Sequence, residues 1–189
     1  MKNSTRFLKN AIIDIDNTLW PFSEAFYLEL KKLNEHFPPP DQWSTFDIWE
    51  GYCSEADFFT AINNIHLHQD RDRHQPYPEA RDFLKSLMEN GFHLILASHR
   101  VPKTRQPTER WLAQHTLPYD DLHISLDKTV LFPDAVVVVD DAPPALEKAV
   151  ACGALGAGLL CPWNRAYADN GFGLFSNLNE VLDYILRSV

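Results

Sequence analysis

The sequence has few cysteines, no surplus of positive charge and no long apolar run. Only three cysteines occur among its 189 residues, Cys53, Cys152 and Cys161. A sparse, odd set without paired spacing argues against a disulfide framework and is typical of a reducing compartment, so we expect a cytoplasmic protein. No apolar stretch reaches membrane-spanning length, and Asp14 and Asp16 interrupt the apolar run after the polar opening segment. The pattern therefore predicts neither a signal peptide nor membrane association.

Basic residues are outnumbered: 17 Lys and Arg stand against 26 Asp and Glu, giving a formal net charge of -9. A nucleic-acid polymer needs rows of cations against its phosphates, so we expect no such partner. A small phosphate ester can still bind an acidic protein if a metal ion and a local cation offset the repulsion. With 45% hydrophobic and 23% charged residues, the composition is that of a globular chain with one main core.

Short apolar runs alternate with helical patterns along the chain. The runs that predict buried strands are residues 11–15, 92–97, 122–125, 135–139 and 154–160. The helical patterns that lie between or after them are residues 79–89, 108–115, 143–151 and 178–186. This alternation predicts an α/β protein with a parallel sheet covered by helices on both faces.

One stretch lacks any convincing strand. Between the first and second predicted strands the sequence shows only helical patterns, at residues 23–36 and 54–65. We expect residues 20–76 to form a small helical lobe, and residues 1–19 and 77–189 to form the core. Eleven of the 23 aromatic residues lie between positions 20 and 60. Most are expected to build the core of the lobe, while Trp20 and Phe22, close to Asp16, are candidates for substrate contact.

Polar side chains follow the predicted strands where ligands of open parallel sheets bind. They are Asp14 and Asp16 after the first strand, Ser98 after the second, Lys128 after the third, and Asp140 and Asp141 after the fourth. Each alone has an ordinary explanation as a turn, cap or solvated residue. Together they predict one crevice in which repelling carboxylates require a hard cation such as Mg²⁺. An ammonium and a hydroxyl complete a site suited to phosphoryl transfer.

Two further segments contain polar residues that could serve either a site or the surface. His99 and Arg100 directly follow Ser98 and could reach a substrate from the rim of the crevice, and Arg100 could instead pair with a carboxylate. Residues 66–74 contain three histidines among charges of both signs. The mixed charges predict a solvated linker returning from the lobe to the core rather than a metal site.

The segment Asp14-Ile15-Asp16-Asn17-Thr18, together with Ser98, Lys128 and Asp140-Asp141, resembles the four motifs of the haloacid dehalogenase-like hydrolases. The resemblance covers residues 11 to about 161. It implies a Rossmann-like, doubly wound core, a Mg²⁺ cofactor, a small phosphorylated substrate and a cap inserted after the first strand, where the helical lobe is expected.

The resemblance also implies roles for the acidic residues. Asp14 would be the nucleophile, and Asp16 the general acid and base that protonates the leaving oxygen and then activates water. Mg²⁺ would be held by the Asp14 side chain, the Asp16 backbone carbonyl and either Asp140 or Asp141. An acid at position 16 favours a phosphatase, because the dehalogenase branch lacks it.

Three further residues would serve the phosphoryl group. Thr18 would brace the first loop of the phosphate-binding site, Ser98 would bind the phosphoryl oxygens, and Lys128 would steady both nucleophile and phosphate. Within the family, the segments around Lys128 and Asp140 are similar to those of 5'(3')-deoxyribonucleotidases, although Asn17 and Ala97 depart from their pattern.

Other interpretations stay open at this point. The segment Asp16-Asn17-Thr18-Leu19-Trp20-Pro21 also resembles magnesium-dependent phosphatase-1, so the substrate could be a sugar phosphate or a phosphoprotein. A non-hydrolytic signalling domain similar to two-component receivers uses related groups, but it carries its acidic pair on the first strand and its acceptor on the third. Here the order is reversed, which favours the enzyme.

Overall fold

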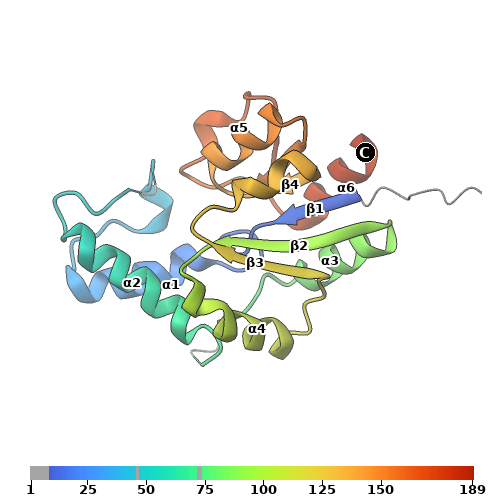
Figure 1. Ribbon diagram of the computed structural model, residues 1–189. Helices are drawn as coiled ribbons and strands as arrows, with labels where there is room; N and C mark the ends of the chain where they lie inside the picture. Colours follow the sequence, from blue (N-terminus) through green and yellow to red (C-terminus); the bar gives the residue numbers. More distant parts are fainter. Residues whose placement is uncertain (1–8, 46, 72–73) are drawn as a thin grey trace, which may run out of the picture.

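A computed structural model describes residues 9–45, 47–71 and 74–189. Within these ranges six parallel strands form one sheet in the order β3-β2-β1-β4-β5-β6 (Figure 1). The strands are β1 (Lys9–Ile13), β2 (Phe92–His99), β3 (Asp121–Ser125), β4 (Ala135–Val139), β5 (Leu155–Leu159) and β6 (Gly173–Phe175). The predicted parallel sheet is confirmed. The strand β6 was not predicted, because its three residues are too short and glycine-rich a stretch to show a strand pattern.

The helices are α1 (Phe22–Leu33), α2 (Glu55–His68), α3 (Ala80–Glu89), α4 (Arg105–Gln114), α5 (Pro143–Ala151) and α6 (Leu178–Ser188). Four short 3₁₀ helices join them in the described chain: η1 (Pro40–Gln42), η2 (Pro102–Thr104), η3 (Thr129–Asp134) and η4 (Arg165–Tyr167). Side-chain caps fix two of the helix starts. Ser54 accepts a hydrogen bond from the Asp57 N–H, and Asn177 accepts one from the Glu180 N–H.

Helices cover both faces of the sheet, as Figure 1 shows for α5 on one side and α3 and α4 on the other. Successive side chains of a strand point to opposite faces. Ile13 therefore packs into the larger core with residues of α3, α4 and α6, whereas Ile12 and Val138 pack into a second cluster with Ala145 and Ala149 of α5. This arrangement is the doubly wound, Rossmann-like α/β fold expected from the sequence.

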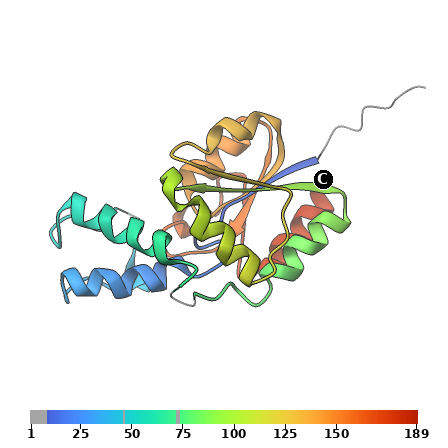
Figure 2. The ribbon, with the colours of Figure 1, turned by 60° about the horizontal axis from the view of Figure 1, so that its bottom comes forward.

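The helices α1 and α2 lie side by side and project from one end of the core (Figures 1 and 2). Aromatic rings fill the space between them. The Phe26 ring lies 4.9 Å from the Phe58 ring, 6.1 Å from the Trp43 ring and 5.4 Å from the Phe22 ring, measured between centroids. Most aromatic residues of this stretch therefore stabilise the lobe itself, as expected for a small apolar core.

The segment predicted as a solvated linker begins differently. The helix α2 continues to His68. The side chains of His66 and Gln69 are buried, where they contact Asp16 and Arg100 of the core, respectively. Residues 72 and 73 lie outside the described residues. The linker prediction is therefore wrong for the part that belongs to α2.

None of the helices in the described ranges combines the length and apolarity that a bilayer span requires. The three cysteines are free thiols, and Cys161 is buried.

Candidate active site

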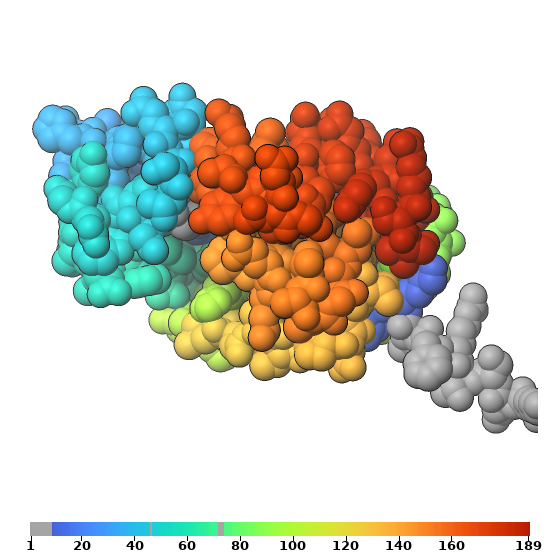
Figure 3. Space-filling view, turned by 90° about the horizontal axis from the view of Figure 1, so that it is seen from above, coloured from blue at the N-terminus to red at the C-terminus, as the bar shows by residue number. Residues whose placement is uncertain are grey.

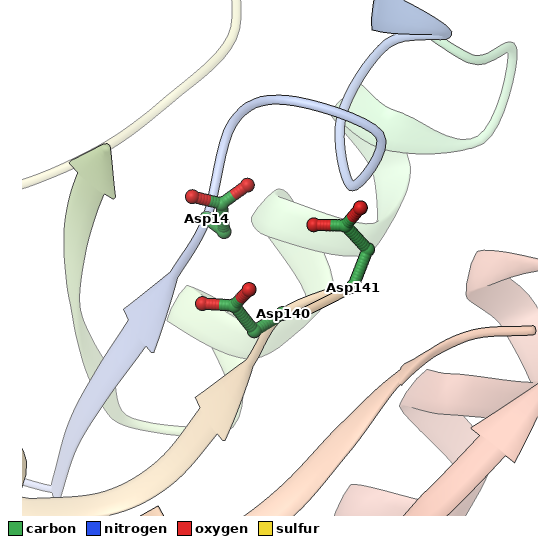
Figure 4. A group of neighbouring side chains, drawn as sticks. All are labelled: Asp14, Asp140 and Asp141. Carbon is green, nitrogen blue, oxygen red and sulfur yellow. The ribbon is translucent and has the colours of Figure 1, made fainter. Parts of the chain in front are cut away.

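Three carboxylates meet at the carboxyl ends of two neighbouring strands. Asp14 follows β1, and Asp140 and Asp141 follow β4 (Figure 4). Each offers an oxygen atom within 4.8 Å of the others, and all three residues are buried. The Asp14 N–H donates a hydrogen bond of 2.8 Å to the Val139 carbonyl, which continues the pairing of β1 and β4 beyond the strands. The parallel sheet thus brings together residues 126 positions apart in the sequence.

One buried ammonium lies among these carboxylates. The Lys128 Nζ contacts Asp14 Oδ1 at 2.5 Å and Asp140 Oδ2 at 2.6 Å. Burial opposes its charge, but the two carboxylates raise the pKa of Lys128 above its ordinary value, so the amine stays protonated. This ion-pair network fixes the position of Asp14.

Lys128 does not neutralise the cluster. Burial raises the pKa of Asp14 well above its ordinary value; Lys128 opposes this rise, while Asp140 and Asp141 add to it. Burial and the neighbouring Asp140 raise the pKa of Asp141 to about 7. Repelling carboxylates with oxygen donors this close suit a hard divalent cation, and the donor set fits Mg²⁺. Asp14, Asp140 and Asp141 could therefore hold such an ion.

A set of polar groups orients Asp141. Its Oδ2 accepts hydrogen bonds from Asn17 Nδ2 at 3.1 Å and from Trp163 Nε1 at 3.0 Å, and its carbonyl accepts one from Asn164 Nδ2 at 3.0 Å. Asn17 adopts a left-handed backbone (φ 54°), and its Oδ1 accepts a 2.7 Å hydrogen bond from the Ser23 N–H. Such outer contacts hold metal ligands in position. We did not predict these roles from the sequence, although Trp163 and Asn164 follow the end of β5, next to β4.

The backbone of Asp140 depends on a glycine of the neighbouring strand. A Cβ atom at Gly158 of β5 would lie 1.9 Å from the Asp140 carbonyl oxygen, so no other residue fits without displacing that carbonyl. The Asp140 N–H donates a 3.0 Å hydrogen bond to the Ala157 carbonyl. The close approach of β5 thus helps to place Asp140 at the end of β4.

Asp16 has different surroundings from the other acids. Its carboxylate accepts two hydrogen bonds from Arg100, at 3.0 Å from Nε and 2.6 Å from Nη2. The guanidinium is fully buried, and its Nη1 also donates to Gln69 Oε1 and Thr108 Oγ1, both at 2.7 Å. The expectation that Arg100 reaches substrate from the rim is therefore wrong. Pairing with a carboxylate, the alternative weighed from the sequence, is what the structure shows.

The pairing sets the protonation state of Asp16. Burial would raise its pKa, but the Arg100 guanidinium and the neighbouring His66 more than offset burial and hold the pKa of Asp16 well below its usual range. The His66 Nε2 lies 3.1 Å from Asp16 Oδ2, and Ser98 Oγ donates to the same oxygen at 3.3 Å. Asp16 is therefore ionised in this arrangement. It could hold a proton only after separating from Arg100.

Trp20 also belongs to this network rather than to a substrate-binding wall. Its side chain is buried, and the indole N–H donates a 3.0 Å hydrogen bond to Asp16 Oδ1. The expectation of substrate contact is therefore not met for Trp20. Thr18 is likewise buried and does not line the cavity described below, and its Oγ1 has no hydrogen-bond partner among the described residues.

A cavity of about 420 Å³ opens between the helical lobe and the core, which Figure 3 shows in contact at their surfaces. Every strand-end residue predicted from the sequence lines this cavity: Asp14, Asp16, Ser98, Lys128, Asp140 and Asp141. Two further predicted residues, His99 and Phe22, line it as well. A larger cavity, of about 830 Å³, lies beside α1 and α2 and contains none of these residues. The smaller cavity is therefore the candidate active site.

The raised pKa of Asp141 predicts a pH-dependent response to Mg²⁺. Because the folded value of about 7 exceeds the ordinary 3.8, ionising Asp141 costs the metal-free protein stability as pH rises through this interval. A divalent cation binds the ionised form, so the increase in melting temperature caused by Mg²⁺ should grow from pH about 5 to about 8. Thermal unfolding in Mg²⁺ or EDTA measures this increase.

The control for this prediction is Asp141→Asn. Its comparison with the wild type is needed because the pKa of His66 is lowered by burial and by Arg100, which makes stability rise with pH in an overlapping interval. The amide should reduce the pH dependence of the Mg²⁺ effect, and the part that comes from Asp14, whose pKa is also raised, should remain. An effect of Mg²⁺ that is equally large in the variant would contradict the assignment.

No family model matches this sequence. No curated protein matches it either. The fold is similar to that of several solved structures. A haloacid dehalogenase-like family hydrolase from Streptococcus pneumoniae has 16% identity and a TM-score of 0.63 over 94% of this chain and 98% of its own. A Thermotoga maritima protein assigned as a β-phosphoglucomutase has 16% identity and a TM-score of 0.64 over 96% of this chain and 100% of its own.

A third neighbour is a Haemophilus somnus protein assigned as a phosphoglycolate phosphatase, with 16% identity and a TM-score of 0.63 over 96% of this chain and 99% of its own. The similarity covers nearly the whole of each chain. The chain therefore has the fold of the haloacid dehalogenase-like hydrolases.

Proposed function

We propose that this protein is a Mg²⁺-dependent phosphatase that hydrolyses small phosphomonoesters through a phosphoryl group carried on Asp14. The observation that supports this most strongly is the position of Asp14, which lines the cavity, contacts Lys128 and lies close to the acidic pair. Asp16, two residues further on, lines the same cavity, so an acid–base residue is available beside the nucleophile. The fold shared with named hydrolases and phosphatases agrees with this chemistry.

In the first step, a carboxylate oxygen of Asp14 attacks phosphorus, and the bond from phosphorus to the alcohol oxygen breaks. Asp16 in its protonated form gives its proton to the departing oxygen. In the second step, Asp16 takes a proton from water, whose oxygen attacks the same phosphorus. The bond to Asp14 breaks, phosphate is released, and Asp14 and protonated Asp16 are restored.

The two steps place opposite demands on Asp16. The ionised form that Arg100 stabilises suits the second step, in which Asp16 accepts a proton from water. The first step requires a protonated Asp16 that has turned from Arg100 towards the cavity. Since His66 of α2 and Gln69, which directly follows α2, lie against the same pair, movement of the lobe would change the environment of Asp16.

The remaining residues bind and orient the phosphoryl group. Lys128 keeps the Asp14 carboxylate in place and supplies a positive charge, and the Ser98 hydroxyl can donate a hydrogen bond to a phosphoryl oxygen. Thr18, which is buried beside the cavity loop and does not line the cavity, would support the loop by packing alone. Mg²⁺, held by the side chains of Asp14 and of Asp140 or Asp141 and by the Asp16 carbonyl, would offset the carboxylate charge and that of the transferring phosphoryl group.

We further propose a nucleoside monophosphate as the leading substrate candidate. Phe22, Trp163 and Tyr167 line the cavity, so a flat base could stack on an aromatic side chain there. This agrees with the sequence resemblance to deoxyribonucleotidases. A sugar phosphate is the alternative, because Ser44 and Thr45 offer hydroxyl groups at the lobe side. The free cysteines support a cytoplasmic location.

Hydrolysis of an aryl phosphate tests the proposal. We expect many phosphates released per protein molecule in Mg²⁺, and a loss of at least about a hundredfold in EDTA that added Mg²⁺ reverses. Phosphate release over time is the measurement. A signalling phospho-acceptor would instead stop after about one phosphate per molecule, and activity that EDTA leaves unchanged would contradict the metal requirement. Comparing kcat/KM for nucleoside monophosphates and sugar phosphates then decides the substrate class.

A further inference from the structure

We infer that the cavity selects phosphomonoesters whose alcohol part carries no second anionic group, and that Asp47 of the helical lobe enforces this selection. The inference deepens the proposed function and rests on it. Phosphorylated carboxylic acids and bisphosphates would be disfavoured, whereas esters of uncharged, hydroxylated or cationic alcohols would be accepted.

The side chains that line the cavity are mostly negatively charged or neutral. Five carboxylates face it, those of Asp14, Asp16, Asp47, Asp140 and Asp141. Among the described lining residues Lys128 is the single Lys or Arg, and Asp14 and Asp140 already contact its ammonium. A bound Mg²⁺ and the substrate phosphate would offset each other, so the cavity would keep its negative charge. A second anion on the substrate would therefore meet repulsion without a partner.

Arg100 cannot supply the missing partner. Its guanidinium lies behind Asp16, and Nε, Nη1 and Nη2 all donate hydrogen bonds to Asp16, Gln69 or Thr108. The side chain is fully buried and is absent from the cavity lining. Its charge is therefore matched inside the protein and is not offered to a ligand.

The two histidines that line the cavity, His66 and His99, do not supply a cation for a second anionic group either. His66 Nε2 lies 3.1 Å from Asp16 Oδ2, so any charge on this ring is matched by that carboxylate. Burial and the nearby Lys128 lower the pKa of His99, which keeps its ring neutral at neutral pH. Neither residue offers a free cation to a second carboxylate or phosphate.

Asp47 lines the cavity from the side of the helical lobe. It comes from the lobe segment between η1 and α2, together with Ser44 and Thr45, and its N–H donates a 3.3 Å hydrogen bond to Thr45 Oγ1. The aromatic and apolar side chains of Phe22, Ile62 and Trp163 line the same cavity. An alcohol held there would meet both apolar surface and oxygen acceptors, a combination that favours hydroxyl or ammonium groups.

Three phenyl phosphates test the selection. They carry an aminomethyl, a hydroxymethyl or a carboxymethyl group at the para position of the ring, and are named below by that group. The methylene group keeps the chemistry at phosphorus similar, so the esters differ mainly in terminal charge. In Mg²⁺ we expect kcat/KM to be about tenfold lower for the carboxymethyl ester than for the hydroxymethyl ester, with the aminomethyl ester at least as good. Asp47→Asn should narrow this difference, and Asp47→Lys should reverse it.

Asp41→Asn is the matched control, because Asp41 is an exposed acid of the same lobe that does not line the cavity. It should leave the ranking of the esters unchanged. Equal kcat/KM for the carboxymethyl and hydroxymethyl esters, or a ranking that Asp47→Lys does not alter, would overturn the inference while leaving the phosphatase proposal intact. Failure to hydrolyse any of the three would overturn the proposed function itself.

Discussion

Replacing Asp14 by asparagine should lower the kcat for phosphate release by at least about 10⁴-fold, because an amide oxygen cannot act as the nucleophile. The substitution keeps the size of the side chain and an oxygen that can accept a hydrogen bond from Lys128. It also removes one charge from a buried, repelling cluster, so the variant should fold and be at least as stable without metal as the wild type. Steady-state hydrolysis of an aryl phosphate in saturating Mg²⁺ measures the loss.

Asp127→Asn provides the control for this experiment. Asp127 precedes Lys128 in the chain, but its side chain is exposed, bonds to Thr129 and does not line the cavity. Its kcat should stay within a few-fold of the wild type. A kcat for Asp14→Asn within tenfold of the wild type would show that Asp14 is not the nucleophile.

Arg100→Met should lower the free energy of unfolding by about 3–5 kcal/mol, because it leaves the Asp16 carboxylate buried without its cation. Gln69 and Thr108 would lose their contacts with the guanidinium as well. The Arg100–Gln69 hydrogen bond joins the end of α2 to the core, so α2 should become less protected. Urea unfolding gives the free energy, and hydrogen exchange of the α2 amides reports the local effect.

Two further variants show whether the stability lost in Arg100→Met comes from the buried ion pair. Arg187→Met removes an exposed arginine paired with Asp183 four residues earlier in α6, and should change stability by less than about 0.5 kcal/mol. The double variant Asp16→Asn, Arg100→Met should be less destabilised than the sum of the single changes, because no unpaired carboxylate remains. A loss for Arg100→Met no larger than that for Arg187→Met would contradict the buried-pair interpretation.

Periodicity and strand-end position predicted most of the core. The run of four valines gave β4 with its observed bounds at residues 135–139, and the segment 143–151 gave α5 in the same way. Once the strands are parallel, their carboxyl ends share one edge, so the meeting of Asp14 with Asp140 and Asp141 followed without any knowledge of side-chain contacts.

The surroundings of Asp16 could not be predicted, because they depend on how the lobe packs against the core. Nothing in local sequence shows that His66 of α2 comes to lie beside Asp16, or Gln69 beside Arg100. Nor does it show that Trp20 turns its indole N–H towards Asp16. Long-range packing also decides that Arg100 is buried rather than exposed at the rim. The same applies to Asp47, whose place in the cavity depends on the path of an irregular segment.

The most direct test of the account is to find the phosphoryl group on the protein. Wild-type protein mixed with excess substrate and Mg²⁺ should be quenched in acid during turnover, digested, and analysed by mass spectrometry. The peptide containing Asp14 should gain the mass of one phosphoryl group, with fragmentation placing it on that residue, and Asp14→Asn should show none. A wild-type enzyme that turns over with no phosphoryl group on Asp14, or with one on Asp140 or Asp141 instead, would contradict it.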